Sequence, residues 1–366
     1  MNIRIVIAGG GTGGHVYPAI GIAKELQLLD SNIDIIFIGG ANQLESKIVP
    51  QNGFRFLPIS TAGFPRKLTL KWFPVMTKLL LGIIKSLQIL AELKPNAVVG
   101  TGGYVSGPVL LAAWAHKIPT FLQEQNASPG ITNRIAGTWV RRAYLALETA
   151  VSHFPSKVAM LTGNPIRRSI STVKRSLNTY VELGLDPNLK TVFVMGGSQG
   201  AKAINSLLIE ALEHFECHNQ HFQLIHQTGK QDLQAVTNKY KESSVKNLIR
   251  SYFDRIEEIY SIVDLMVCRA GGMTVSEITA CGIPSILIPL PYAAGNDQLA
   301  NAKTIANKGA GIVLDQFSID GKTLANHIIN IVTDSVRLNN MSKASHQLGK
   351  SKAGEVIAES IYNLMR

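Results

Sequence analysis

The sequence predicts an α/β protein built from two Rossmann-like, doubly wound halves. Short apolar runs alternate with segments of helical apolar spacing along the whole chain, which is typical of a parallel sheet with helices on both faces. Most of these runs are continuously apolar, as expected of strands covered on both sides. The predicted strands are residues 3–8, 33–38, 97–99, 120–122, 143–147, 191–195, 222–226, 265–268 and 285–288. A length of 366 residues predicts about two domains.

A glycine-rich turn follows the first strand. Residues 9–15 read Gly-Gly-Gly-Thr-Gly-Gly-His and precede a helical run over residues 18–26, with Pro18 expected in its first turn. A strand that turns through glycines into a helix points backbone N–H groups and the positive end of the helix dipole at one spot, which suits a phosphate. His15, at the edge of this turn, is a candidate proton carrier because an ordinary histidine titrates near neutral pH.

The second half of the chain repeats this plan. Residues 190–195 form a strand-like run, residues 196–201 read Gly-Gly-Ser-Gln-Gly-Ala, and a helical pattern follows to Leu212. The repeat predicts two domains facing a cleft, 1–166 and 167–344, divided at the turn-rich Gly163-Asn-Pro-Ile-Arg167. One large sheet with two glycine turns is the alternative.

Further polar turns follow other predicted strands. In a parallel sheet the loops after the strands emerge at one edge, so residues 100–107 and the run Glu124-Gln-Asn126 should join the first turn. Glu277 and Gln298 lie near the starts of helices that follow predicted strands in the second half. Asn126 could instead cap a helix, Gln298 could also cap, and Glu277 could be a surface acid near a helix start.

Charge and composition narrow the class of protein. The net charge is +11, and residues 1–166 hold 15 basic and 7 acidic residues, which implies an acidic partner: nucleic acid, anionic lipid or a phosphorylated substrate.

Three cysteines without metal spacing favour a reducing compartment. No leader or membrane span is expected, because Lys78, Lys85 and Glu92 interrupt the most apolar stretch. No carboxylate pair or His/Cys cluster has metal-ligand spacing, so backbone dipoles and basic side chains must handle a diphosphate.

Residues 63–87 form the remaining unusual stretch. Apolar side chains follow helical spacing there, and lysines recur every seven residues on a neighbouring face. The stretch could lie on an anionic bilayer, or it could be a core-packing helix with a solvated basic edge. The basic N-terminal half favours the membrane surface, with contacts expected from Lys71, Trp72, Val75, Met76, Lys78 and Leu79.

Taken together, six motifs resemble the MurG family of bacterial N-acetylglucosaminyltransferases. They are GGTGGH ending at His15, GGYVSG ending at Gly107, EQN ending at Asn126, GNPIR ending at Arg167, GGSQGA ending at Ala201 and CRAGGMTVSE ending at Glu277. The resemblance implies a GT-B fold, with residues 345–366 packing back on the first domain. It implies a peripheral enzyme, without metal or other cofactor, at the cytoplasmic face of the inner membrane. Its reaction would be inverting transfer from UDP-N-acetylglucosamine to the C4 hydroxyl of the muramoyl sugar of lipid I, giving lipid II. An anionic membrane surface is then the expected acidic partner, and nucleic acid is not.

The resemblance also implies roles for individual residues. His15 is the expected base, with Glu124 as a competing or assisting carboxylate. The remaining substrate contacts would come from Thr12, Gly13, Gly14, Tyr104, Asn126, Arg167, Ser198, Phe253, Gly272, Met273, Thr274, Val275, Ser276, Glu277 and Gln298. Among these, Asn126 and Gln298 would contact the sugar, Arg167 and Ser198 the diphosphate region, and Glu277 the ribose. The backbone near Phe253 would hold the uracil.

Three other readings remain open at the level of sequence. A related GT-B enzyme could glycosylate a diacylglycerol and would differ in the acceptor loops of the first domain. An NAD-linked oxidoreductase is disfavoured, because the second predicted strand ends without the acidic residue that binds ribose and the next acid is Glu45. A non-catalytic membrane scaffold would leave both glycine turns and His15 unexplained.

Overall fold

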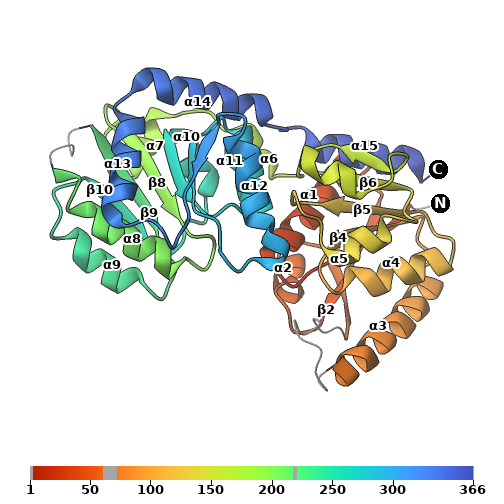
Figure 1. The fold of residues 1–366 in the computed structure, drawn as a ribbon. Coiled ribbons are helices and arrows are strands. Elements are labelled where there is room, and N and C mark those ends of the chain that lie inside the picture. Colours follow the sequence, from red (N-terminus) through yellow and green to blue (C-terminus); the bar gives the residue numbers. More distant parts are fainter. Residues whose placement is uncertain (1–2, 61–71, 217–220, 366) are drawn as a thin grey trace. The chain divides into compact units, whose positions relative to one another are not determined.

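A computed structural model describes residues 3–60, 72–216 and 221–365, with side chains at 72–74 and 294 left aside. The chain divides into two compact units. Unit 1 comprises Met1–Ile166 and Ser351–Arg366, and unit 2 comprises Arg167–Lys350. Each unit is a parallel sheet between helices (Figure 1).

Unit 1 has a seven-stranded sheet in the order β3-β2-β1-β4-β5-β6-β7. Its strands are β1 Arg4–Gly9, β2 Asp34–Gly40, β3 Arg55–Ile59, β4 Ala97–Gly102, β5 Thr120–Glu124, β6 Arg142–Leu145 and β7 Ala159–Leu161. Its helices are α1 Gly13–Leu29, α2 Glu45–Gln51, α3 Trp72–Leu93, α4 Ser106–Ala115, α5 Ile131–Ala136, the 3-10 helix η1 Glu148–His153 and α15 Ala353–Leu364. The order reverses between β1 and β4, and ligands bind parallel sheets at such a switch point, beyond the carboxyl ends of the strands.

Alternate residues of β1 explain why its sequence is continuously apolar. Ile5 and Ile7 belong to a core with residues of α1 and α15, whereas Val6 and Ala8 belong to a second core with residues of α3 and α4. All four side chains are fully buried. The last helix, α15, contributes Ile357 and other residues to the first of these cores, and it packs on α1.

Unit 2 has a six-stranded sheet in the order β10-β9-β8-β11-β12-β13. Its strands are β8 Lys190–Met195, β9 Phe222–Gln227, β10 Asn247–Arg250, β11 Leu265–Cys268, β12 Ser285–Leu287 and β13 Gly311–Val313. Its helices are α6 Arg168–Ser171, α7 Leu177–Glu182, α8 Lys202–Leu212, α9 Leu233–Tyr240, α10 Ile256–Ile262, α11 Gly272–Ala280, the 3-10 helix η3 Ala294–Asn296, α12 Asp297–Ala306, α13 Gly321–Val332 and α14 Ser335–Leu348. Helices α8, α9 and α13 share one core with the sheet, and α11 packs against α12 and α14 (Figure 1).

The structure confirms the α/β class, the parallel sheets and every predicted strand to within three residues at each end. The four strands that the sequence missed, β3, β7, β10 and β13, all lie at sheet edges. β7 and β13 are only three residues long, so their apolar runs are too short to predict a strand. β3 and β10 begin with a polar residue and are partly exposed, so they show no continuous apolar run. The expected position of Pro18 in a first helical turn is wrong: α1 begins at Gly13, and Pro18 lies inside the helix.

Candidate active site

The glycine turn of unit 1 is held by a buried carboxylate. Glu45, at the start of α2, is 1% exposed, and its two oxygens accept hydrogen bonds from the N–H groups of Gly11 at 2.9 Å and Gly40 at 2.8 Å. A β-carbon on Gly10 would lie 2.0 Å from Oε1 of Glu45, so a larger residue there would displace this carboxylate. Glu45 therefore fixes the shape of the turn between β1 and α1.

A second glycine turn, after β4, packs directly on the first. The N–H of Gly10 donates to the carbonyl of Gly102 at 3.4 Å. Gly103 has a φ of +81°, and a β-carbon there would lie 2.2 Å from the carbonyl oxygen of Gly10. The loops after β1 and β4 thus meet at one edge of the sheet, as the strand order predicts.

His15 lies where these two turns meet the loop after β5. Its Nδ1 is 2.9 Å from Oε1 of Gln125 and 3.1 Å from the carbonyl oxygen of Thr101. Its own carbonyl accepts the hydroxyl of Thr101 at 2.9 Å. The contacts at Nδ1 therefore help to orient the imidazole, as a catalytic histidine needs.

Glu124 occupies a different environment from His15. It is 1% exposed, and its oxygens accept from the N–H groups of Asn126 at 3.0 Å and Gly130 at 3.2 Å and from Nδ2 of Asn133 at 2.8 Å. Burial raises the pKa of Glu124, and these bonds oppose the rise. The carboxylate thus shapes its own loop. Asn126 is half-buried beside it, and Tyr104 is 50% exposed.

The residues expected to approach the donor in unit 1 are accessible. Thr12 and Gly14 are exposed, and Gly13 is half-buried, at the start of α1. Their N–H groups belong to the first turn of the helix, where backbone donors have no intrahelical partner. This arrangement suits an anion.

The glycine turn of unit 2 is tied to its neighbours through Gln227. This buried side chain donates from Nε2 to the carbonyl of Gly197 at 3.1 Å and accepts the N–H of Phe253 at 3.0 Å. Ser198, in the same turn, is exposed. Phe253 is 4% exposed and packs edge-on against Phe193, so its side chain is part of the core and its N–H is bound to Gln227. Gln227 therefore joins the expected phosphate turn to the expected uracil loop.

Glu277 lies in the second turn of α11. The hydroxyl of buried Tyr260 donates to its Oε2 at 3.1 Å. Burial raises the pKa of Glu277 to about 7 and Glu257 adds to the rise, whereas Arg167 and the Tyr260 bond oppose it. Arg167 is exposed at the start of the unit. A half-buried carboxyl group whose pKa is raised in this way is a candidate ligand-binding group.

The segment before Glu277 opens α11 after its Gly271 N-cap. Met273, Thr274 and Ser276 are half-buried, whereas Gly272 and Val275 are buried, so Val275 could offer only its backbone. Gln298, near the start of α12, is half-buried, and its Oε1 accepts the N–H of Leu290 at 2.9 Å.

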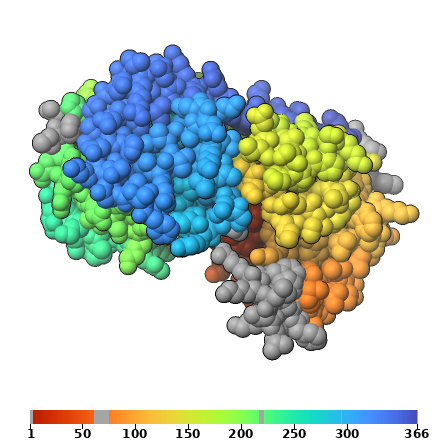
Figure 2. Space-filling view, viewed as in Figure 1, coloured from red at the N-terminus to blue at the C-terminus, as the bar shows by residue number. Residues whose placement is uncertain are grey.

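The structure changes which residues of α3 are candidates for membrane contact. This helix lies at the outside of unit 1 (Figure 2). Val75 is buried, since it faces the interior of the unit, and is removed from the set; Leu79 is half-buried. Met76 and Lys78 are exposed, Lys71 lies outside the described residues, and nothing is described of the Trp72 side chain. The exposed apolar side chains are Met76, Leu80, Leu81 and Ile84, at 41–58% exposure. The sequence missed the last three because apolar spacing marks a stripe without saying which side the protein covers.

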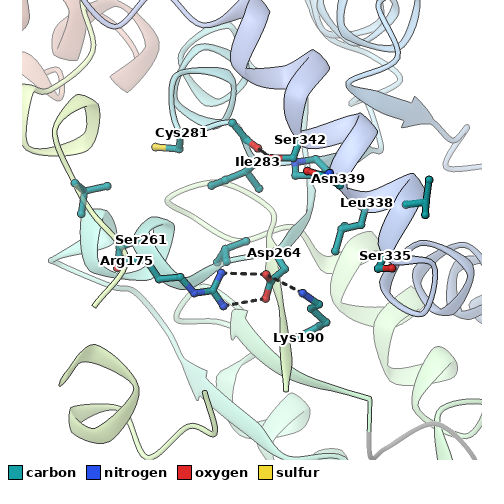
Figure 3. A pocket seen from close by; sticks show the side chains of 15 residues that line it. Arg175, Lys190, Ser261, Asp264, Cys281, Ile283, Ser335, Leu338, Asn339 and Ser342 are labelled. Carbon is teal, nitrogen blue, oxygen red and sulfur yellow. Dashed lines mark hydrogen bonds and ion pairs between the residues drawn. The ribbon is translucent and has the colours of Figure 1, made fainter. Parts of the chain in front are cut away.

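A pocket of about 740 Å³ lies elsewhere in unit 2, at the amino ends of the strands (Figure 3). Asp264 accepts from Arg175 at 3.1 Å and from the N–H of Thr191 at 2.8 Å, and it pairs with Lys190 at 3.8 Å. Because the glycine turns follow the carboxyl ends of the strands, this pocket is separate from the candidate site.

Within residues 3–60, 72–216 and 221–365, no group of three or more His, Cys, Asp or Glu side chains is arranged to hold a metal ion. Over the same ranges, no helix combines the length and apolarity that crossing a bilayer requires.

Two Rossmann-like units, each with a parallel sheet and a glycine turn leading from strand to helix, form the GT-B fold. The chain belongs to glycosyltransferase family 28: residues 5–145 match its N-terminal domain and residues 191–358 its C-terminal domain.

Two full-length relatives carry the same name. A UDP-N-acetylglucosamine–N-acetylmuramyl-(pentapeptide) pyrophosphoryl-undecaprenol N-acetylglucosamine transferase of Bacillus pumilus is 40% identical, over 100% of this chain and 99% of the relative. The protein of that name from Bacillus subtilis is 39% identical over 95% of both chains. The crystal structure of Acinetobacter baumannii MurG superposes with a TM-score of 0.80 at 27% identity, over 99% of both chains.

Proposed function

We propose that this chain transfers N-acetylglucosamine from UDP-N-acetylglucosamine to the C4 hydroxyl of the muramoyl sugar of lipid I, giving lipid II. The observation that carries the proposal is the 40% identity, over the whole chain, to a relative named for this transfer. The local geometry of both units is compatible with it. Unit 1 offers an oriented imidazole beside a glycine turn. Unit 2 offers a second glycine turn and, on α11, a carboxyl group whose pKa is raised by burial.

His15 acts as the general base in this proposal. It takes the proton of the acceptor hydroxyl while that oxygen forms a bond to the anomeric carbon of the donor sugar. The bond from this carbon to the UDP oxygen breaks in the same step, so the α linkage of the donor becomes a β linkage. The geometry favours His15 over Glu124, because both Glu124 oxygens already accept bonds from their own loop. Glu124 then supports the loop that carries Gln125 and Asn126.

The donor is bound by both sets of turn residues in this proposal. Thr12, Gly13 and Gly14 approach it from the start of α1, and Tyr104 and Asn126 lie on the neighbouring loops. In unit 2, Ser198 and the N-terminal turn of α11 stabilise the leaving diphosphate, as backbone N–H groups and a helix dipole favour negative charge. Arg167 adds positive charge, Glu277 accepts the ribose hydroxyls, Gln298 contacts the sugar and the Phe253 loop holds the uracil. That the two units share one cleft remains a prediction, as does the independence of metal.

The surface of α3 is proposed to contact an anionic membrane, which would place the enzyme peripherally at the cytoplasmic face of the inner membrane. Its exposed apolar side chains, Met76, Leu80, Leu81 and Ile84, share the helix with exposed Lys78 and Lys85. Apolar groups next to lysines are typical of helices that lie in a bilayer interface.

The decisive experiment measures transfer of labelled N-acetylglucosamine from UDP to lipid I, with diacylglycerol as a second acceptor and with or without a chelator. The proposal predicts product from lipid I alone, and the same rate with the chelator. Transfer to diacylglycerol alone would instead support the related lipid glycosyltransferase.

The membrane contact has its own test with vesicles that contain anionic lipid. Leu80→Gln and Leu81→Gln should each weaken binding by on the order of 1–2 kcal/mol, since each removes a largely exposed apolar side chain. Leu177→Gln changes an exposed leucine of unit 2 and serves as the matched control. Undiminished vesicle binding by the α3 variants would indicate that this helix has only a structural role.

A further inference from the structure

Three buried side-chain amides in unit 1 form a hydrogen-bonded chain that ends at His15. Asn164, Gln123 and Gln125 are 1%, 0% and 2% exposed. Nε2 of Gln123 donates to Oδ1 of Asn164 at 2.7 Å, Nε2 of Gln125 donates to Oε1 of Gln123, and Oε1 of Gln125 lies 2.9 Å from Nδ1 of His15. We refer to the three amides as the amide relay.

Backbone carbonyls fix the orientation of the amide next to His15. Nε2 of Gln125 is 2.7 Å from the carbonyl oxygen of Thr101 and 3.2 Å from that of Gln123. A carbonyl oxygen only accepts hydrogen bonds, so the nitrogen of Gln125 must lie on this side. Its oxygen therefore faces His15.

The far end of the amide relay is fixed in the same way. Nδ2 of Asn164 donates to the carbonyl oxygen of Gln125 at 3.2 Å, which leaves Oδ1 of Asn164 to accept from Gln123. Gln123 in turn must present its oxygen to Gln125. Rotating any one amide by half a turn would set two acceptors, or two donors, against each other in a buried site.

This arrangement determines which nitrogen of His15 carries the proton. Both neighbours of Nδ1, Oε1 of Gln125 and the carbonyl oxygen of Thr101, are acceptors, so Nδ1 must be protonated. In the neutral ring the proton-free nitrogen is then Nε2. We propose that the amide relay holds His15 in the Nδ1–H tautomer and so presents Nε2 as the proton acceptor, which makes Gln125 a positioning residue. The catalytic part of this inference rests on the proposed function.

The amide relay does this with neutral groups only. Titratable side chains on the neighbouring elements include Tyr17 on α1, Glu45 on α2, Tyr104 and Glu124 after β4 and in β5, and Arg134 on α5. Glu45 binds the N–H groups of Gly11 and Gly40, and Glu124 binds donors of its own loop. A carboxylate in place of the Gln125 amide would favour the imidazolium and raise the pKa of the ring, whereas the amide selects a tautomer without adding charge.

The first test is spectroscopic and needs no substrate. The full chain is labelled with nitrogen-15 at histidine, and long-range proton–nitrogen spectra report the tautomer of each ring; the signals absent from His15→Gln belong to His15. The proposal predicts the Nδ1–H pattern at neutral pH. An Nε2–H pattern would overturn it whatever reaction the protein catalyses. Conversely, full transfer activity of His15→Ala would reject the proposed base and leave this result standing.

The second test is the pH profile of kcat/KM for transfer by Gln125→Glu, with Gln27→Glu as the matched change at an exposed position of α1. A carboxylate beside Nδ1 should shift the acidic limb upward by about one to two pH units. The control should keep the original profile. If Gln125→Glu does not fold, Gln125→Met is the alternative, because it removes one of the two acceptors at Nδ1 of His15. In this variant the fraction of His15 in the Nδ1–H tautomer and kcat should fall together, while the donor KM stays unchanged. An unshifted acidic limb in Gln125→Glu, or an unchanged tautomer and kcat in Gln125→Met, would contradict the assignment.

Discussion

The carboxyl group of Glu277 should make donor binding depend on pH. Burial is the largest cause of its raised pKa of about 7, and Arg167 and Tyr260 oppose the rise. If the ribose hydroxyls donate to the ionised form, the apparent affinity follows the ionised fraction, which is about one tenth at pH 6 and about nine tenths at pH 8. UDP-N-acetylglucosamine should therefore bind about tenfold more tightly at pH 8, a difference of about 1.4 kcal/mol.

Calorimetry of UDP-N-acetylglucosamine binding at both pH values measures this difference. Glu277→Gln should bind weakly and with little pH dependence, because its side chain does not titrate. Glu213→Gln, at an exposed position after α8, should keep the tenfold change. Equal affinities of the unchanged protein at pH 6 and pH 8 would refute the role of Glu277.

The same raised pKa has a consequence for stability. Between the ordinary pKa of 4.5 and about 7, the folded chain holds the Glu277 proton more firmly than the unfolded chain. This contribution to stability is complete below pH 4.5 and is lost as the pH rises through 7. Glu277→Gln should therefore gain stability relative to the unchanged protein between pH 5 and pH 8, as seen in urea unfolding; a constant difference would contradict the shift.

Three further perturbations separate the roles of the two units. His15→Ala should lower kcat by about 10²–10⁴-fold, the range for a general base, and leave the calorimetric affinity for UDP-N-acetylglucosamine unchanged; near-normal turnover would reject the base. Gln227→Leu removes the hydrogen bonds to Gly197 and Phe253. Each bond contributes about 1 kcal/mol, and relaxation of the loops should offset part of the loss, so the donor KM should rise about tenfold. An unchanged KM would show that these loops do not contribute to donor binding. Asp264→Ala removes the carboxylate that binds the N–H of Thr191 and the side chains of Arg175 and Lys190. The free energy of unfolding in urea should fall by about 2–3 kcal/mol, and the folded variant should keep its transfer activity. A loss of transfer in the folded variant would link the pocket of Figure 3 to the reaction.

The elements that the sequence predicted well are those buried on both faces. Ile5 to Ala8 are apolar in succession because alternate side chains enter two different cores. The edge strands β3 and β10 consist mostly of half-buried and exposed residues, so their composition does not distinguish them from loops. Apolar spacing predicted that α3 is a helix. It could not predict which side of α3 is exposed, because that side is determined by the packing of α4 against it.

The sequence could propose the site residues that belong to recognisable motifs, but not those whose role depends on contacts made in the folded chain. His15, Glu277 and the glycine turns are visible as residue types in a pattern. The sequence assigned no site role to Glu45, Gln125 or Gln227, because their function depends on partners distant in sequence, such as Gly11 for Glu45. The available signal was a polar residue at or just beyond the end of an apolar strand, as at Gln227.

The most direct test of the account is the rate at which the purified chain moves labelled N-acetylglucosamine from UDP to lipid I, compared between the unchanged protein and His15→Gln. We expect robust transfer by the first, and a loss of at least a hundredfold in the second with the UDP-sugar still bound. Equal rates, or no transfer to lipid I by the unchanged protein under conditions where it binds the UDP-sugar, would contradict it.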